Sequence, residues 1–242
     1  MRGLLHLIPV TLGAGDVLAT HPPGVLHITD SLDYFIVEKA KSARAELKRL
    51  RFSHPLATTQ IEELPDNPDA PAIDALLSPI CNGRHGGLMS EAGCPAVADP
   101  GALVVRRAHE LGIRVVPHVG PSSLLLALMA SGLNGQSFAF HGYLPVKPDE
   151  CAATIRQLEQ ESARLGRTQL FIETPYRNKA MFQGLVDTCD STTLISLARS
   201  LTTSAEWIHT NTVRGWRESE VPDLDRQPTV FLLLAARMKS RR

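Results

Sequence analysis

The sequence has no excess charge of either sign and no long hydrophobic run. Its 242 residues include 25 basic and 25 acidic side chains, which excludes a globally basic nucleic-acid-binding protein. No stretch approaches the ~18 consecutive apolar residues of a membrane-spanning helix, so we expect no membrane segment. With 43% hydrophobic and 21% charged residues, the composition is that of an ordinary globular protein.

Several common catalytic and metal sites are also missing. The four cysteines, Cys81, Cys94, Cys151 and Cys189, form no C-x-x-C pair, and the histidines lack metal-ligand spacing, so we predict no metal site. Neither a G-x-S-x-G elbow nor a P-loop occurs. LGAGD begins like a dinucleotide-binding fingerprint, but Leu18 occupies the place of the third glycine.

The N-terminal segment and the cysteine spacing indicate where in the cell the protein is located. Arg2 precedes an apolar run, but Pro9 interrupts the run and no small-residue cleavage site follows, so we interpret it as a buried strand rather than an export signal. Widely spaced cysteines without a disulfide pattern are typical of a reducing compartment. The sequence therefore predicts a cytoplasmic protein.

The first half of the chain alternates strand and helix patterns, which predicts a mostly parallel sheet. We expect strands at Leu4–Val10, Val25–Thr29, Gly87–Ser90 and Ile113–Pro117. We expect helices at Lys39–Arg51, at Ile73–Cys81, and from Asp99, as the cap, to Gly112.

The second half has a different character, and we predict an α/β domain with a mixed sheet there. Helices are expected at 150–165 and 177–189, and strands at 168–173, 193–199 and 229–235. The last strands follow one another without a helical pattern, which favours antiparallel pairs. We place the boundary near Pro117 to Pro121, giving two α/β domains, 1–118 and 119–242.

Two loops of the first half are suited to binding a ligand. Ligands of open α/β sheets bind beyond the carboxyl ends of the strands. In EAGCPAVADPG, residues 91–101, the small side chains leave the backbone accessible. Ser122 and Ser123 then add hydroxyls and amides at a helix start, where an anionic group is favoured.

Basic residues concentrate in one segment, and two interpretations of it stay open. Glu46 is the only acidic residue between Lys39 and Arg51. The segment is either a solvated helix face or a patch that contacts RNA phosphates. The basic residues concerned are Lys39, Lys41, Arg44, Lys48, Arg49 and Arg51.

Five motifs in order resemble the tetrapyrrole methylase superfamily, and particularly its ribosomal RNA small-subunit methyltransferase I branch. EAGCPAVADPG is similar to the pattern D-A-G-x-P-x-I/V-S/A-D-P-G. LHLIPVTLG, HVGPSSLLLALMASGL, FAFHGYLPVK and FIETPYR resemble the branch's V-x-T-P-I-G opening strand, P-G-P-S-A helix, F-x-G-F-L-P-x-K turn and F-Y/F-E-S/A-P-H-R strand end. The resemblance implies two α/β domains, a homodimer, and S-adenosyl-L-methionine as cofactor.

The resemblance also assigns residues to the cofactor. Carried over position by position, the contacts in the first half are Thr11, Leu12, Gly93, Cys94, Val97, Ser122 and Ser123. Those further along the chain are Glu173, Ala198, Pro228 and Thr229. For the apolar Val97 and Ala198, a simple packing role is the alternative.

The chain departs from the branch at two places near the expected substrate. It has Glu38, Lys39, Ala40 and Lys41 where E-D-T-R is usual, and Glu91 where the first motif usually has aspartate. We assign Glu38 and Lys39 to catalysis, with Glu38 as base or substrate orienter. The alternative is that Glu38 starts a helix and pairs with Lys39 or Lys41.

Three functions from different classes therefore stay open. The first is a methyltransferase that uses S-adenosyl-L-methionine and acts on RNA, by family analogy at a ribose hydroxyl. The second is a methyltransferase of a tetrapyrrole or another small metabolite, which the balanced charge would suit. The third is a homologue that binds cofactor or RNA without turnover.

Overall fold

The chain folds into two compact units, Met1–Ser122 and Ser123–Arg242. The computed structural model describes residues 2–220 and 223–237. The domain boundary that we expect after residue 118 lies four residues before this division, and it stays a prediction. In the described part, no helix combines the length and the apolar character that crossing a membrane requires.

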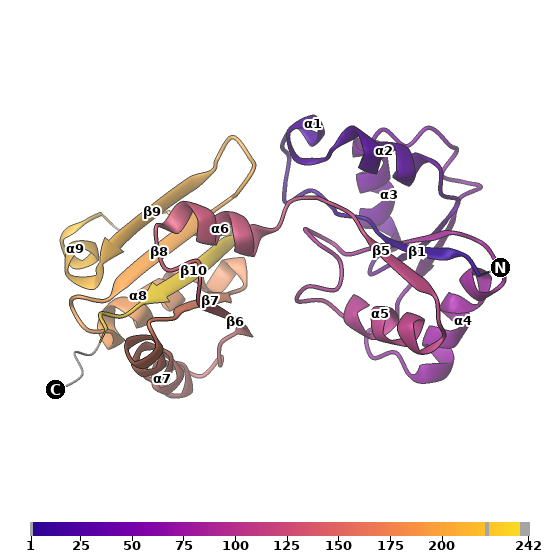
Figure 1. The fold of residues 1–242 in the computed structure, drawn as a ribbon. Helices are drawn as coiled ribbons and strands as arrows, with labels where there is room; N and C mark the ends of the chain where they lie inside the picture. Colours follow the sequence, from indigo (N-terminus) through magenta and orange to yellow (C-terminus); the bar gives the residue numbers. More distant parts are fainter. Residues whose placement is uncertain (1, 221–222, 238–242) are drawn as a thin grey trace. The chain divides into compact units, whose positions relative to one another are not determined.

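The first unit is a parallel sheet with helices on both faces (Figure 1). Its strands are β1 (Leu4–Leu7), β2 (Tyr34–Val37), β3 (Gln60–Glu63), β4 (Gly86–Met89) and β5 (Arg114–Pro117), in the order β3-β2-β4-β1-β5. Its helices are α1 (Val17–Thr20), α2 (Pro23–Asp30), α3 (Ala40–Arg49), α4 (Ala70–Cys81) and α5 (Gly101–Glu110). All of these strand pairs are parallel, which confirms the predicted sheet.

Alternate residues of each strand supply two separate cores. Tyr34 and Ile36 of β2 pack with side chains of α4 and α5, whereas Phe35 and Val37 pack with α3. This arrangement follows from the two-residue period of a strand that is buried on both sides. Because all strands run in one direction, the segments that follow them share one edge of the sheet.

The prediction of a strand at Val25–Thr29 is wrong. The two prolines before it fix the backbone for the first turn of a helix, and the segment lies in α2. Val25 and Thr29, four residues apart, are its buried positions. The strand in this part of the sequence is instead β2, which follows α2. The sequence analysis also missed β3, where the charged pattern QIEE conceals an edge strand.

The second unit has a mixed sheet, as predicted. Its strands are β6 (Phe138–Tyr143), β7 (Thr168–Ile172), β8 (Leu194–Arg199), β9 (Trp207–Thr212) and β10 (Thr229–Leu234), in the order β6-β7-β10-β8-β9. Only β6 and β7 are parallel among these pairs. Its helices are α6 (Ser123–Ser131), α7 (Pro148–Leu165), α8 (Asn178–Thr188) and α9 (Val213–Glu218), with a short 3₁₀ turn at Pro175–Arg177. Since α9 separates β9 from β10, the expected absence of a helix between the last strands is wrong there.

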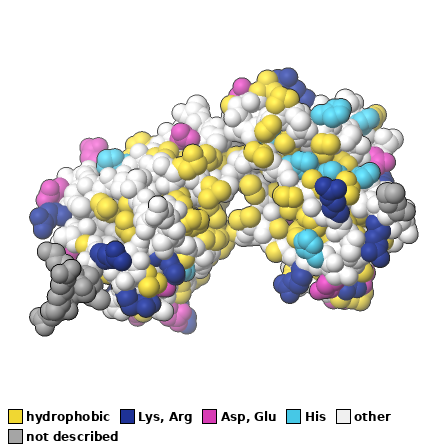
Figure 2. Space-filling model, viewed as in Figure 1, with side chains coloured by type: hydrophobic (Ala, Val, Ile, Leu, Met, Phe, Trp, Pro, Cys, Tyr) yellow, Lys and Arg dark blue, Asp and Glu magenta, His cyan; other side chains and the backbone are white. Residues whose placement is uncertain are grey.

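Histidines lie together on the first sheet. The Nδ1 atom of His6 is 2.9 Å from the Nε2 atom of His118, and the ring of His85 is 5.9 Å from that of His6. Figure 2 shows histidine side chains gathered on the visible face of this unit. In the part of the chain that the structure describes, no three histidine, cysteine or acidic side chains are placed to hold a metal ion.

Candidate functional site

Three loops converge at the carboxyl edge of the first sheet. After β1, Val10 pairs with Gly93 of the loop after β4 through reciprocal hydrogen bonds of 2.9 and 3.0 Å. The thiol of Cys94 donates to the carbonyl oxygen of Pro121, after β5, at 3.5 Å. The structure therefore brings the predicted residues Gly93 and Cys94 beside the segments that carry Thr11, Leu12 and Ser122.

The closeness of these loops requires glycine at position 93. Gly93 has a φ of +73°, and a Cβ added to it would lie 3.3 Å from Leu12 Cδ2 and 3.6 Å from the carbonyl oxygen of Pro121. A residue other than glycine would strain the backbone at this φ, and its Cβ would crowd the side chain of Leu12. The edge is thus built from backbone that lies close to other backbone, as the small side chains predict.

The loop that leads into α5 is held by Asp99. Ala96 and Ala98 have φ angles of +67° and +63°, a left-handed conformation that is unfavourable for residues other than glycine. Asp99 Oδ1 accepts hydrogen bonds from the N–H groups of Ala96 at 3.0 Å and of Gly101, the first residue of α5, at 2.7 Å. The expectation that Asp99 is the cap of this helix is off by one residue, because Pro100 is the N-cap of α5, and Asp99, one residue earlier, binds the first N–H group of the helix. Burial raises the pKa of the Asp99 carboxyl group. Val97 is 48% exposed, so its side chain is accessible.

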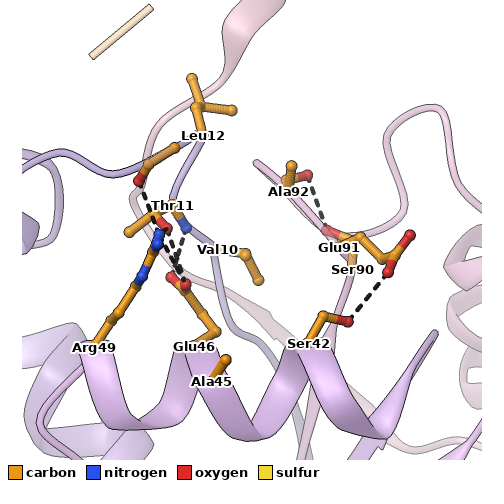
Figure 3. A pocket seen from close by; sticks show the side chains of 11 residues that line it. Val10, Thr11, Leu12, Ser42, Ala45, Glu46, Arg49, Ser90, Glu91 and Ala92 are labelled. Carbon is orange, nitrogen blue, oxygen red and sulfur yellow. Dashed lines mark hydrogen bonds and ion pairs between the residues drawn. The ribbon is translucent and has the colours of Figure 1, made fainter. Parts of the chain in front are cut away.

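A pocket of about 260 Å³ lies between α3 and the loops after β1 and β4 (Figure 3). Its lining residues are Val10, Thr11, Leu12, Gly13, Ser42, Ala45, Glu46, Arg49, Ser90, Glu91 and Ala92. Glu46 and Arg49 point from α3 toward the loop after β1, and Ser42 points toward Glu91. The pocket thus joins two predicted cofactor residues, Thr11 and Leu12, to the helix that carries the basic residues.

Glu38 follows β2 at the same edge of the sheet. Its Oε1 atom accepts a hydrogen bond of 3.1 Å from the N–H group of Glu91. Burial raises the pKa of Glu38, and the negative charges of Asp99 and Glu91 raise it further against the opposing effects of the Glu91 N–H group and of Lys39. A carboxylate with raised proton affinity is suited to general-base catalysis.

Neither lysine near Glu38 pairs with it. The Nζ atom of Lys39 is 3.4 Å from Asp66 Oδ1, and no ion pair joins Glu38 to Lys39 or Lys41 in residues 2–220 and 223–237. In the part of the chain that it describes, the structure therefore shows no ion pair of the kind that the alternative interpretation of Glu38 expects. The roles of Glu38 and Lys39 in catalysis stay predictions.

The basic residues of the segment 39–51 are all exposed, but they differ in their contacts. Lys39 faces Asp66, and Arg49 donates hydrogen bonds to Thr11 and Gly13. Within the described residues, four others have no ion-pair partner: Lys41, Arg44, Lys48 and Arg51. These four are the cations that a polyanion can reach without breaking an existing contact.

The predicted residues of the second unit gather at one edge of its own sheet. Val230 of β10 lies between Ala198 of β8 and Ile172 of β7 in the sheet. Glu173 directly follows Ile172, so it lies at the same edge. Pro228 accepts a hydrogen bond of 2.8 Å from Ser200 N–H. Thr229 starts β10. The structure therefore brings Glu173, Ala198, Pro228 and Thr229 close together.

Two of these side chains are already engaged within the unit, Glu173 by polar contacts and Ala198 by packing. Glu173 is 5% exposed, accepts a hydrogen bond of 2.7 Å from Thr174 N–H, and lies 3.1 Å from the guanidinium group of Arg177. Ala198 is only 1% exposed, so packing is the role that its position favours. Ser123 begins α6, directly after Ser122.

The sequence analysis missed Glu46. Its carboxylate is buried and bonded to Thr11. A signal was present, because Glu46 is the only acid in a basic segment and lies one residue from the apolar Leu47. An acid beside the buried stripe of an amphipathic helix predicts a polar partner in the core.

The comparisons with known proteins agree with this fold. No family model matches the chain. A crystal structure of the methyltransferase CobJ has a TM-score of 0.64 at 18% identity and covers 97% of this chain and 95% of its own. A uroporphyrin-III C-methyltransferase from Thermus thermophilus has a TM-score of 0.55 at 17% identity, over 97% of this chain and 93% of its own. The fold is therefore that of tetrapyrrole methyltransferases.

Sequence relatives are closer. Ribosomal RNA small subunit methyltransferase I of Xylella fastidiosa is 29% identical over 96% of this chain and 81% of its own length. The protein of the same name from Vibrio cholerae is 30% identical over 85% of this chain and 67% of its own length. This chain belongs to the ribosomal RNA small subunit methyltransferase I family and is a methyltransferase.

Proposed function

We propose that this methyltransferase uses S-adenosyl-L-methionine as methyl donor and RNA as acceptor. The observation that carries the proposal is the convergence of the three loops at one sheet edge, beside a helix with unpaired cations. By family analogy, the acceptor is a ribose hydroxyl. The same analogy supports a homodimer and a cytoplasmic location. Light scattering of the purified protein tests the homodimer.

The residues of the loops fit the proposed cofactor. The small side chain of Ala92 lines the pocket and leaves the backbone there accessible, and Val97 offers an accessible apolar surface. The cofactor contacts that we propose on these loops and directly after them are Leu12, Gly93, Cys94, Val97, Ser122 and Ser123. Glu173, Ala198, Pro228 and Thr229 are the residues that we propose from the second unit. When bound, S-adenosyl-L-methionine supplies an activated methyl group.

Glu38 and Lys39 are the proposed catalytic residues. Methyl transfer mainly requires that donor and acceptor be held in line, and a hydroxyl acceptor must also lose its proton. Glu38, with its raised pKa, would take that proton. Lys39, the next residue and the N-cap of α3, is exposed, so it would orient the acceptor.

The acceptor's phosphates would be bound by α3. Lys41, Arg44 and Lys48 are spaced three and four residues apart, so they form one stripe of the helix. Ser42, Ala45 and Arg49 form the next stripe, which lines the pocket. An RNA bound to the first stripe would therefore lie close to the pocket.

The first experiment measures cofactor binding and the destination of the methyl group. Calorimetry with S-adenosyl-L-methionine and S-adenosylhomocysteine is expected to show binding, and no heat at millimolar ligand would refute the proposal. Labelled cofactor is then incubated with RNA, protein and metabolite fractions. Label in RNA supports the proposal, label in metabolites supports the small-molecule alternative, and binding without any label supports the non-catalytic one.

A salt series tests the basic stripe. Each phosphate contact contributes roughly 0.7 to 0.9 to the slope of log affinity against log salt. The triple variant Lys41→Met, Arg44→Met, Lys48→Met is therefore expected to lower the slope for RNA by about 2 to 3, with binding of S-adenosylhomocysteine unchanged. An unchanged slope would remove α3 from the RNA interface.

A further inference from the structure

Glu46 is a buried carboxylate that bonds to the loop after β1. It is 6% exposed, although the basic residues of the same segment are all exposed. Its Oε1 atom accepts a hydrogen bond of 2.7 Å from Thr11 N–H, and its Oε2 atom accepts one of 2.9 Å from the Thr11 hydroxyl (Figure 3). Both oxygens of one carboxylate are thus used on a single loop residue.

Arg49, one helical turn later, extends the same contact. It donates hydrogen bonds of 3.0 Å to the carbonyl oxygen of Gly13 and of 3.2 Å to Thr11 Oγ1. The guanidinium group is also 4.0 Å from Glu46 Oε2. Glu46 and Arg49 together therefore hold residues 11–13, and we call this pair the α3 clamp.

Packing alone does not require the α3 clamp. Ala43 and Leu47 of α3 and its C-cap Leu50 form a buried apolar stripe, and an apolar residue at position 46 would continue it. A buried carboxylate costs free energy that hydrogen bonds and ion pairs only offset, and apolar replacements of buried ion pairs are often as stable. Glu46 therefore needs a reason other than stability.

The loop that the α3 clamp holds is fixed on its other side as well. Val10, directly before it, pairs with Gly93 through the reciprocal bonds described above. The segment from Val10 to Gly13 is thus fastened to both the loop after β4 and α3. A ligand at the sheet edge meets a loop whose position is set before binding, which lowers the ordering cost of binding.

We infer that Glu46 and Arg49 are positioning residues for the cofactor, and this inference rests on the proposed function. They act through Thr11, because the N–H group and hydroxyl of Thr11 are already engaged by the clamp. Thr11 therefore serves as the anchor of the loop, and Leu12 is the residue that the loop presents to the cofactor. Arg49 therefore serves mainly to hold this loop, and contact with RNA is its secondary role.

The second unit contains a matched control for Glu46. Glu159 Oε1 accepts hydrogen bonds from Asp190 N–H at 2.8 Å and from the Thr193 hydroxyl at 2.5 Å. It is also a helix carboxylate that binds a backbone N–H and a threonine hydroxyl of a loop. Glu159 lies outside every predicted site, so its substitution tests the loss of such a contact without the proposed role.

The experiment compares Glu46→Leu, Glu46→Gln and Glu159→Leu in the full chain. Glu46→Leu removes both acceptors, whereas Glu46→Gln keeps one acceptor and loses the charge beside Arg49. We expect the Kd of S-adenosylhomocysteine to rise about tenfold or more in Glu46→Leu and less in Glu46→Gln, with no change in Glu159→Leu. The KM for S-adenosyl-L-methionine is expected to rise likewise, with RNA affinity in its absence unchanged.

The outcomes separate this inference from the proposed function. If the unsubstituted protein does not bind S-adenosylhomocysteine, the proposed function fails. If it does bind, and folded Glu46→Leu and Glu46→Gln bind equally well, the positioning role is refuted. The role is also refuted if Glu159→Leu weakens binding as much as Glu46→Leu, because the effect would then be a general loss of stability. Circular dichroism and thermal unfolding establish which variants are folded.

Discussion

The two units place their predicted ligand residues in different surroundings. In the first unit these residues lie on loops after parallel strands, and polar side chains such as Glu46 and Asp99 hold the loops by their N–H groups. In the second unit Ser123 begins α6 and the others lie at strand ends of a mixed sheet, where Ala198 is buried and Glu173 is paired with Arg177.

This difference predicts how substitutions act in each unit. A loop that is held by a few hydrogen bonds can move while its sheet stays folded, so changes in the first unit affect binding before stability. A buried strand residue cannot change without disturbing its core. The following predictions test this separation.

The largest effect is expected from Ala96→Trp. The indole would fill the edge of the site, and the left-handed φ of residue 96 adds strain for a bulky side chain. We predict that binding of S-adenosylhomocysteine is lost in calorimetry, while circular dichroism shows an intact fold. Ala96→Gly, which accepts this φ without strain, is the control and should bind as the unsubstituted protein does. Unchanged affinity of Ala96→Trp would place the site elsewhere.

Glu38→Gln is expected to stop the chemical step without affecting the cofactor. The amide oxygen can still accept the hydrogen bond from Glu91 N–H, but it cannot take a proton. Loss of a general base typically lowers the rate by ~10²- to 10⁴-fold, so single-turnover methyl transfer should fall within that range. Affinity for S-adenosylhomocysteine should stay the same.

The pH dependence supplies a check on this role. Because burial raises the pKa of Glu38, the acid limb of the rate profile should lie above the ordinary range for a glutamate. Glu91→Gln removes a charge that contributes to this increase, so it should move the limb to lower pH. A limb that does not move would assign the proton transfer to another group.

The sequence was informative where local chemistry decides the structure. Small residues in EAGCPAVADPG predicted an accessible backbone edge, and Asp99 and Pro100 predicted a helix start, which lies within two residues of the expected place: Pro100 is the N-cap, and Asp99 binds the N–H group of Gly101. These features depend on neighbouring residues alone. The strand at Val25–Thr29 failed because a short apolar run fits a strand and a helix equally, and the two preceding prolines decided the outcome.

Sequence patterns did not predict polar contacts between residues far apart in the chain. Glu46 and Thr11 are 35 positions apart, and neither residue type indicates the other. The edge strands β3 and β9 were missed for a related reason, since exposed strands carry charged and polar residues that depend on a neighbouring strand for support.

Acid should weaken the first unit more than the second. Burial, followed by nearby His118 and His85, lowers the pKa of His6 from 6.5 to about 4. Between these values the unfolded chain binds the proton and the folded unit does not, so stability present above pH 6.5 is lost as the pH falls toward about 4. Hydrogen exchange of β1 should accelerate over this range, and His6→Leu should remove part of the dependence.

Fluorescence provides the comparison for this acid effect. Trp207 and Trp216 are the two tryptophans of the chain and both lie in the second unit. The wavelength of their emission maximum should change little over the range in which exchange of β1 accelerates. Wavelength is the measure to use, because the ring of His209 lies 5.8 Å from that of Trp207 and 5.0 Å from that of Trp216, where an imidazole can quench the emission intensity. A shift of the maximum to longer wavelength at the same pH would show that the two units unfold together and would contradict the separation.

The smallest effect is expected from Ser122→Ala. Ser122 is the last residue before α6, a helix start whose amides favour an anionic group such as the cofactor's carboxylate. Loss of one hydrogen bond should weaken binding of S-adenosylhomocysteine by about 1 kcal/mol, or roughly fivefold. Ser122→Thr keeps the hydroxyl and should restore the affinity. Since no core residue changes, thermal stability should move by less than binding does, and a larger loss of stability than of affinity would assign Ser122 to the fold rather than to the site.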